Sequence, residues 1–454
     1  MDFEIPLKVK KIIEKFSEAG AEIYIVGGAT RDLILGREVK DWDFTTNLTP
    51  EEMKKLFPKN GFCNNVFGTF SVVGKDKEIF EITTFRTEQG YSDSRHPDQV
   101  LWGKTLEEDL QRRDFTINAM ALKTKPSKSP FDKGDLIIID LYKGQEDLKN
   151  GLIRTVGNPN ERFGEDALRM MRAVRIASQI AFTIEDNTFA SMQKNAPLIN
   201  KIAGERVRDE LFKILLSPVP ADGIRLLKNT GLLKEIIPEL LEGVDFAQKG
   251  HHVHDVWNHN LKTLEHCQST SPITRLACLL HDVGKPKAAR GEGETRTFHN
   301  HEVIGSRMAM EIGKRLRLSN DELNQLFRLV RWHMFTVTEL QTDAAVRRFI
   351  RNVTLEYVEE MIALRRGDRL GSGAKETSWR WDKFRERIIE VQKQPFSVKD
   401  LKIDGHDVME ILGIPPGPRI GEILTSIFAE VEIKPELNVR EVLMEKIRLL
   451  KPTL

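Results

Sequence analysis

The hydrophobic pattern of this chain changes its period part of the way along, so one type of architecture cannot serve the whole sequence. Over about the first 145 residues, short apolar runs such as EIYIVGG, FSVVG and IFEITTF alternate with turn clusters, which is typical of strands in one sheet. From about residue 160, as in RFGEDALRMMRAVRIASQI, apolar residues recur every three or four positions, which is typical of amphipathic helices. We therefore predict an α+β fold, with a mixed β-sheet in an N-terminal head and only helices after it.

Length and composition limit the class of protein. A chain of 454 residues is too long for one core and predicts several domains. Its 40% hydrophobic and 30% charged residues describe an ordinary soluble protein, and a net charge of +1 leaves only a local basic surface for nucleic acid. The three cysteines lie outside any C-x-x-C spacing, and no apolar run is long enough to span a membrane. We expect a cytoplasmic protein without a membrane segment.

Residues 40–47, KDWDFTTN, place two aspartates on either side of a tryptophan in a strand-like stretch. Because alternate side chains of a strand point to opposite faces, Asp41 and Asp43 are expected on one face, with Trp42 and Phe44 on the other. Two like charges so placed repel each other unless a cation lies between them. The pair is therefore either a solvated strand end or a clamp for a divalent metal.

Two nearby segments favour the metal clamp. In YIVGGATRDLILG a strand runs into Gly27 and Gly28, and a helix follows from about Ala29. Such a turn is often turn chemistry alone, but it also lets backbone amides approach a phosphate. A third acid, Glu81, interrupts the apolar run IFEITTF. Phosphate binding beside converging carboxylates suits two Mg²⁺ ions about 4 Å apart, which activate an attacking hydroxyl and stabilise a departing pyrophosphate.

The motifs GGATRD, KDWDFTT, FEITTFR and EEDLQRRDFTINAMAL follow one another in this order. Together they resemble the class II tRNA nucleotidyltransferases, the bacterial and eukaryotic CCA-adding enzymes of the DNA polymerase beta-like superfamily. The resemblance runs from residue 21 to about residue 215. It implies a polymerase beta-like head that uses Mg²⁺, binds ATP and CTP, and adds C, C and A to the 3′ end of tRNA.

The resemblance also implies roles for single residues. Asp41 and Asp43 match the metal ligands, and Glu81 matches a further catalytic acid whose direct contact with metal stays open. The residues that match nucleotide-binding motifs are Gly27, Gly28, Arg31, Asp32, Arg112, Arg113, Asp114 and Asn118.

A later segment, GEDALRMMRAVR, resembles the family's motif E-D-x-x-R. On one helix Asp166 and Arg169 would be neighbours, and alone this spacing describes an ordinary ion pair. The functional reading has more specific chemistry. A carboxylate accepts from the exocyclic amine of C or A and a guanidinium donates to the adjacent ring nitrogen, whereas U and G present a carbonyl to the carboxylate. We expect Asp166 and Arg169 to select the base, with Arg172 as a helper.

Most of the histidines lie between residues 251 and 370, in VWNHNLKTLEHC, LACLLHDVGKP, FHNHEVIGS and VRWHM, ahead of LRRGDRLGSG. In this order the segments resemble the HD superfamily of metal-dependent phosphohydrolases. The implied metal ligands are His259, His281, Asp282 and Asp368, with His299, His301 and His333 as further candidates. Imidazole with carboxylate suits a divalent transition metal or Mg²⁺. We expect phosphoester hydrolysis there, and the alternative is a helical domain that has lost this chemistry.

Several readings of the function stay open. Bacterial poly(A) polymerases share the catalytic motifs, but NNVFGTFSVV and the polar residues 87–111 favour the CCA-adding pattern, the latter resembling the loop that switches from C to A addition. This loop carries His96 where a second arginine is common. The chain could also add CC only or A only, act as an HD phosphohydrolase with a vestigial head, or bind RNA without catalysis.

The predicted domains follow the motifs. They are a nucleotidyltransferase head at 1–145, a helical neck with the base-reading motif at 146–220, a helical HD domain at 221–375 and a helical tRNA-binding region at 376–454. We expect tRNA to be recognised by shape and backbone, with strongly salt-dependent binding.

Overall fold

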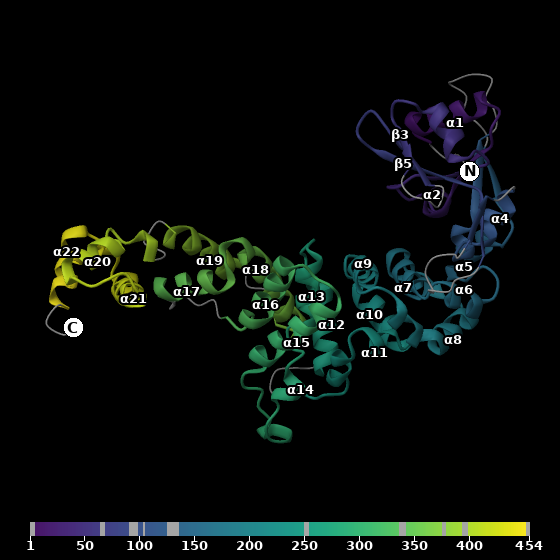
Figure 1. Cartoon of the computed structure of the whole chain (residues 1–454). Helices are drawn as coiled ribbons and strands as arrows, with labels where there is room; N and C mark the ends of the chain where they lie inside the picture. Colours follow the sequence, from purple (N-terminus) through teal and green to yellow (C-terminus); the bar gives the residue numbers. More distant parts are fainter. Residues whose placement is uncertain are drawn as a thin grey trace. The chain divides into compact units, whose positions relative to one another are not determined.

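The structure is a computed structural model that describes residues 5–63, 69–89, 99–102, 105–124, 136–248, 254–335, 342–374, 378–392 and 398–450. The chain divides into two compact units (Figure 1): residues 1–241 with 315–318, and residues 242–314 with 319–454. The finer division into four domains stays a prediction. Over the described part of the chain, no helix is long and apolar enough to cross a bilayer.

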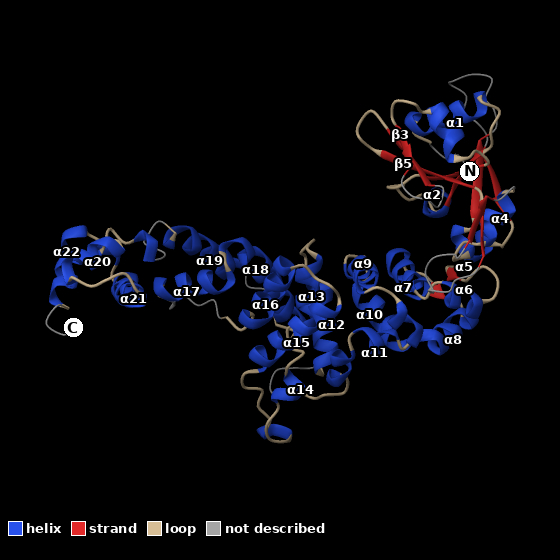
Figure 2. Ribbon diagram, viewed as in Figure 1, coloured by secondary structure: helices blue, strands red, loops and turns tan. Residues whose placement is uncertain are grey.

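A seven-stranded mixed sheet forms the scaffold of the head and confirms the predicted α+β fold (Figure 2). Its strand order is β3-β4-β5-β2-β1-β8-β9. Strands β2 and β5 pair in parallel, and the other neighbours pair antiparallel. The strands are β1 (Ile23–Val26), β2 (Asp43–Thr46), β3 (Gly61–Cys63), β4 (Thr69–Val73), β5 (Ile79–Thr84), β8 (Met120–Thr124) and β9 (Leu136–Asp140).

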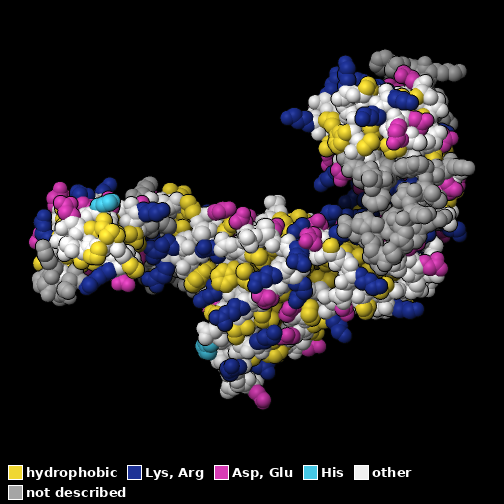
Figure 3. Space-filling view, in the orientation of Figure 1, with side chains coloured by type: hydrophobic (Ala, Val, Ile, Leu, Met, Phe, Trp, Pro, Cys, Tyr) yellow, Lys and Arg dark blue, Asp and Glu magenta, His cyan; other side chains and the backbone are white. Residues whose placement is uncertain are grey.

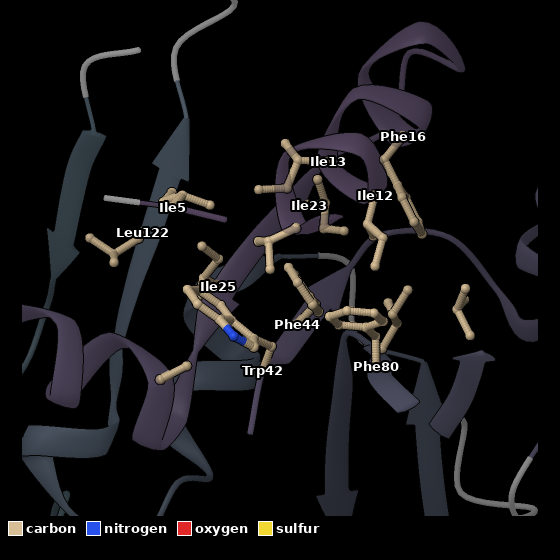
Figure 4. Close-up of a cluster of buried hydrophobic side chains, with 14 of the residues drawn as sticks. Ile5, Ile12, Ile13, Phe16, Ile23, Ile25, Trp42, Phe44, Phe80 and Leu122 are labelled. Atoms are coloured by element: carbon tan, nitrogen blue, oxygen red, sulfur yellow. The ribbon is translucent and has the colours of Figure 1, made fainter. Parts of the chain in front are cut away.

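One face of this sheet is covered by the amphipathic helix α1 (Leu7–Glu18), which buries Val9, Ile12, Ile13 and Phe16. Trp42 and Phe44 lie in the same apolar cluster (Figure 4), and both are more than nine-tenths buried. Burying each ring contributes roughly 2–3 kcal/mol. The two rings therefore anchor β2 from behind, as the alternation of the sequence predicted.

The remaining elements of the first unit are mostly helical. The long helix α7 packs against α9 and α10. The helices are α2 (Gly27–Ile34), α3 (Pro50–Leu56), α4 (Leu106–Gln111), α5 (Gly144–Asn150), α6 (Pro159–Glu165), α7 (Leu168–Ile180), α8 (Asp186–Asn195), α9 (Gly204–Leu215), α10 (Pro220–Asn229) and α11 (Leu232–Ile236). Two short strand pairs complete it: β6 (Arg86–Gln89) with β7 (Gln99–Trp102), and β10 (Leu152–Ile153) with β11 (Thr183–Ile184).

The second unit is built from helices, as predicted. Helix α12 packs against α13 and α18, and α13 also packs against α16. Helices α20, α21 and α22 have an apolar cluster of their own. The helices are α12 (Val256–His266), α13 (Pro272–Leu280), α14 (Lys285–Ala288), α15 (His301–Arg315), α16 (Asn320–Trp332), α17 (Asp343–Val353), α18 (Val358–Gly371), α19 (Ser378–Val391), α20 (Gly405–Leu412), α21 (Pro418–Ile433) and α22 (Arg440–Leu449).

Candidate active sites

Two acids of the head meet on neighbouring strands. Asp43 opens β2 and is the direct register partner of Glu81 on the parallel strand β5. Asp41 lies in a bend ahead of β2 and is exposed, so the prediction that both aspartates belong to the strand is wrong for Asp41. Trp42 still turns into the core between the two acids.

The partly buried position of Asp43 disfavours the charged form of its carboxyl group. Burial is the main cause that raises the pKa of Asp43 to about 6; Arg113 opposes this shift, and Glu81 and Asp41 add to it. The ligand atoms of the three acids do not gather within 4.8 Å of one another among the described residues. Like charges without a cation repel each other, and an all-carboxylate donor set suits Mg²⁺. The chemistry of these acids therefore fits a divalent cation, although they are not gathered around one point in this structure.

The glycine turn lies against this acid. Helix α2 begins at Gly27, two residues earlier than predicted, and Gly27 has φ +68°. A Cβ atom at Gly27 would lie 3.4 Å from both Asp43 Oδ2 and Arg113 Nη1. A side chain at this position would therefore be strained by the positive φ and would contact both charged groups. Gly28 follows in the first turn of α2, with a guanidinium nitrogen of Arg31 3.6 Å from the position of its Cβ.

Arg112 and Arg113 are joined by a buried acid, Asp109, to which the sequence motifs give no role. Asp109 on α4 accepts from Arg112 Nη2 at 2.8 Å through one oxygen and from Arg113 Nη2 at 2.9 Å through the other. The three residues are spaced i, i+3 and i, i+4, so this spacing was a usable signal.

A second network links the head to the long helix α7. Arg172 on α7 donates to Asp114 Oδ2 through Nη2 at 2.7 Å, and Asn118 donates to Asp114 Oδ1 at 3.3 Å. Burial opposes the charged form, but Arg172 holds the pKa of Asp114 well below its ordinary value. Arg31 in turn donates to Asn118 Oδ1 at 3.1 Å and pairs with Asp32 at 2.9 Å. The structure thus joins five of the predicted nucleotide-binding residues in one hydrogen-bonded set: Arg31, Asp32, Asp114, Asn118 and Arg172.

The predicted base-reading pair is arranged differently from the prediction. Asp166 is not helical but lies in extended conformation between α6 and α7, where its Oδ1 accepts from the backbone N–H of Leu168 at 2.9 Å. Its Oδ2 accepts from Arg206 on α9 at 2.9 Å. The assumption that one helix carries both residues is therefore wrong, because the helical conformation is interrupted at Asp166.

Arg169, by contrast, lies on α7 as expected and is nine-tenths buried. It pairs with Glu165 at 2.7 Å through Nη1, and its Nη2 donates to the backbone carbonyl of Arg112 at 3.2 Å. The residue that reads a base by resemblance therefore contacts the turn that carries the two arginines.

The second unit gathers six side chains of the HD motifs into one buried cluster. His259 Nε2 lies 3.1 Å from His281 Nε2 and 3.1 Å from Asp368 Oδ1. Asp282 belongs to two groups whose ligand atoms lie within 4.8 Å of one another: His259 with His281 and Asp282, and Asp282 with His301 and His333. His299 is exposed and is in neither group.

Three of the four histidines of this cluster share one orientation. Nδ1 of His281, of His301 and of His333 lies 2.9, 2.8 and 2.8 Å from the backbone carbonyl three residues earlier. Since a carbonyl only accepts, each Nδ1 carries the proton, and the lone pair of each Nε2 faces the cluster. This is the usual way in which proteins orient histidine for a metal. Burial lowers the pKa of His333 to about 3, so that imidazole is neutral at pH 7. The donor set fits a divalent metal.

Two cations balance the acids of the cluster. Lys285 pairs with Asp282 Oδ2 at 2.6 Å, and Arg365 pairs with Asp368. Although burial favours the neutral acid, Lys285 and His281 hold the pKa of Asp282 well below its ordinary value. Neither cation was predicted from the sequence, and the spacing of each, three residues from its acid, was the available signal.

One contact of the site was not predicted, and some predictions fall on residues that the structure does not describe. Arg206 was not predicted because it lies forty residues from Asp166 in the sequence and no local pattern marks it. Of the predicted switching loop, residues 90–98, which include His96, and residues 103–104 lie outside the described residues, as do residues 64–68 at the start of NNVFGTFSVV.

Family comparisons divide the chain in the same order as the motifs. Residues 23–154 match the model of the poly A polymerase head domain, residues 181–243 that of a "probable RNA and SrmB- binding site of polymerase A", and residues 256–368 that of the HD domain.

Similar proteins cover nearly the whole chain. A CCA-adding enzyme of Ligilactobacillus salivarius is 35% identical over 97% of this chain and 96% of its own length, and one of Limosilactobacillus reuteri is 35% identical over 96% and 95%. The crystal structure of the Bacillus stearothermophilus CCA-adding enzyme in complex with CTP is 28% identical, covers 99% of this chain and 100% of that chain, and has a TM-score of 0.73. The Thermotoga maritima enzyme complexed with tRNA, at 22% identity and a TM-score of 0.57, shares the fold. This chain therefore belongs to the CCA-adding enzymes, the class II tRNA nucleotidyltransferases, and carries an HD domain.

Proposed function

We propose that this protein adds C, C and A to the 3′ end of tRNA from CTP and ATP, in the cytoplasm and without a nucleic-acid template. The observation that carries the proposal is the meeting of Asp43 and Glu81 beside the glycine turn and Arg113. Acids alone would bind a cation, and a glycine turn alone would bind an anion. Here the acids lie beside the glycine turn, and this arrangement suits a nucleoside triphosphate that binds together with Mg²⁺.

The residues divide the work of nucleotide transfer. We assign Asp41 and Asp43 to Mg²⁺ and Glu81 to its support. When bound, Mg²⁺ would favour attack by the tRNA 3′-hydroxyl and departure of pyrophosphate. The residues assigned to the triphosphate and ribose are Gly27, Gly28, Arg31, Asp32, Arg112, Arg113, Asp114 and Asn118. Their networks hold these donors and acceptors in place before the nucleotide arrives, which lowers the cost of ordering them.

Base choice is assigned to Asp166 and Arg169, with Arg172 as a helper. Asp166 uses one lone pair of each carboxylate oxygen for Leu168 and Arg206, and a carboxylate has about four such positions. Capacity therefore remains to accept from the amine of cytosine or adenine. Uracil and guanine would bring a carbonyl against the carboxylate, so they would be rejected by repulsion rather than by size.

The decisive experiment offers tRNA ending at the discriminator base, at C and at CC, with each of the four nucleotides separately, and sequences the products. We expect C on the first two substrates, A on the third, and no further addition. A run of A beyond one residue would assign the chain to the poly(A) polymerases, and products that stop at CC or gain only A would assign it to the partial enzymes.

A second activity is supported by a specific observation: two buried acids lie together with four buried histidines whose Nε2 atoms face the cluster. We propose that His259, His281, Asp282 and Asp368 hold a divalent metal, and that His301 and His333 provide a second group of ligands around Asp282. A divalent metal there would polarise a phosphoester for hydrolysis. The test incubates the protein with Mn²⁺, Ni²⁺, Co²⁺ or Mg²⁺ and a 2′,3′-cyclic nucleotide or a phosphomonoester. Absence of hydrolysis with every metal would leave the cluster a structural remnant.

A further inference from the structure

Asp109 is a fully buried carboxylate in the head, and no motif role falls to it. It lies on α4, whose N-terminus is closed by a capping box between Thr105 and Glu108, and its exposed fraction is 0%. Burying a carboxylate costs several kcal/mol unless charged partners compensate it. The partners of Asp109 must therefore account for its burial.

Asp109 divides its two oxygens between two arginines. Oδ1 accepts from Arg112 Nε at 3.2 Å and Nη2 at 2.8 Å, and Oδ2 accepts from Arg113 Nε at 3.3 Å and Nη2 at 2.9 Å. Each guanidinium therefore presents the same edge to the acid. Although burial opposes ionisation, Arg113 and Arg112 keep the pKa of Asp109 below its ordinary value.

The opposite edge of Arg113 faces the proposed nucleotide site. Its Nη1 lies 3.4 Å from the position of a Cβ at Gly27, and Asp43 Oδ2 lies at the same distance from that position. The backbone carbonyl of Arg112 accepts from Arg169 Nη2 at 3.2 Å. The pair held by Asp109 thus reaches the acids on one side and the proposed base-reading arginine on the other.

Two adjacent guanidinium groups repel each other and have many rotamers, so they do not keep a fixed position unaided. One acid between them removes the repulsion and leaves a net charge of +1 for an anion. We propose that Asp109 is a positioning residue of the nucleotidyl transfer, which acts through Arg112 and Arg113 by fixing them for the nucleoside triphosphate. This proposal rests on the function proposed above.

The test compares Asp109→Asn with wild type in the full chain. The amide keeps the shape but presents an N–H₂ to one of the guanidinium groups, so one arginine loses its anchor. Since the loss of one hydrogen bond to a charged group weakens binding about ten- to a hundredfold, we expect KM for CTP and ATP to rise by about this factor, while KM for tRNA stays within about twofold. Glu107→Gln is the matched control, because it removes an exposed charge from the same helix. Unchanged nucleotide KM in Asp109→Asn, or an equal rise in KM for tRNA, overturns the proposal.

Arg112→Ala/Arg113→Ala separates positioning from folding. In that variant Asp109 keeps a buried charge without these two partners, so the melting temperature should fall, and adding Asp109→Asn should restore it. The nucleotide affinity of the triple variant, measured by equilibrium dialysis with CTP, should equal that of the double variant. A further loss of affinity in the triple variant would show that Asp109 acts independently of the arginines. Dialysis does not depend on turnover, so a failure of CCA addition by wild type is distinguished from a failure of Asp109 to position the two arginines.

Discussion

Asp43 and Glu81 lie directly opposite each other in the register of β2 and β5, which pair in parallel within the seven-stranded sheet. The strands that carry these acids are separated in the sequence by β3 and β4, so the acids meet only when the sheet forms. Their meeting places negative charge where burial already disfavours it. A site built in this way is less stable without a cation than with one. A single substitution there can therefore test both the stability of the protein and its activity.

Asp43→Asn should abolish nucleotide addition and also stabilise the metal-free protein. The pKa of Asp43 is raised from 3.8 to about 6, so between these values the folded carboxyl binds a proton that the unfolded one has lost. Stability therefore falls as pH rises through this window, and the amide escapes this fall. We expect addition to drop at least about a hundredfold, and the unfolding free energy at pH 8 in EDTA to rise by about 3 kcal/mol, measured by urea titration.

Asp41→Asn is the matched control for this prediction. Asp41 is exposed, so its amide removes a proposed metal ligand without relieving a buried charge. Addition should fall, but stability should stay within about 0.5 kcal/mol. Equal stabilisation by both variants would contradict the role given to burial.

His259→Ala should remove metal from the second unit and spare nucleotide addition. His259 is buried, and its Nε2 lies within 3.4 Å of His281, Asp282 and Asp368. His266→Ala on the same helix α12 is the control, because His266 is exposed. After dialysis against Mn²⁺, elemental analysis should find bound manganese in wild type and in His266→Ala but not in His259→Ala. Loss of CCA addition in that variant would argue against two separate sites.

Arg206→Ala should weaken the discrimination between bases and have a smaller effect on the stability of the fold. Arg206 holds one oxygen of Asp166, so its loss frees the carboxylate to rotate. We expect addition of U or G relative to C to rise about tenfold, which corresponds to about 1.4 kcal/mol of lost discrimination. Competition assays with mixed nucleotides on tRNA ending at the discriminator base measure this ratio. Arg208→Ala on the same helix, whose partners are Asp209 and the carbonyl of Arg317, should leave it unchanged.

Binding of tRNA should weaken steeply with salt although the net charge is only +1. Basic and acidic side chains are interspersed on the face shown in Figure 3, so contact with phosphates must come from local groups of Lys and Arg. We expect affinity to fall about a hundredfold between 50 and 200 mM salt, measured by filter binding. A flat dependence would contradict recognition through the RNA backbone.

Much of the molecule could be predicted from short-range pattern. The change of hydrophobic period separated the sheet from the helices, and the HD motifs named six residues that the structure gathers in one cluster. Of the D-x-D stretch, only Asp43 lies in the strand beside Glu81. Pairs three or four residues apart, such as Asp282 with Lys285 or Asp109 with Arg113, could also be predicted from their spacing. Helical and strand geometry fixes such neighbours locally.

What the sequence determined by itself was the set of chemical groups and the type of element on which most of them lie. Only the tertiary structure decided their partners: Glu81 for Asp43, Arg172 for Asp114, and Arg206 for Asp166. Register across a sheet and packing between helices depend on the fit of whole buried surfaces. Asp166 is the clearest case. Its neighbours in sequence predicted a helical pair with Arg169, but the helix is interrupted at Asp166, and an arginine from α9 sets the position of its carboxylate.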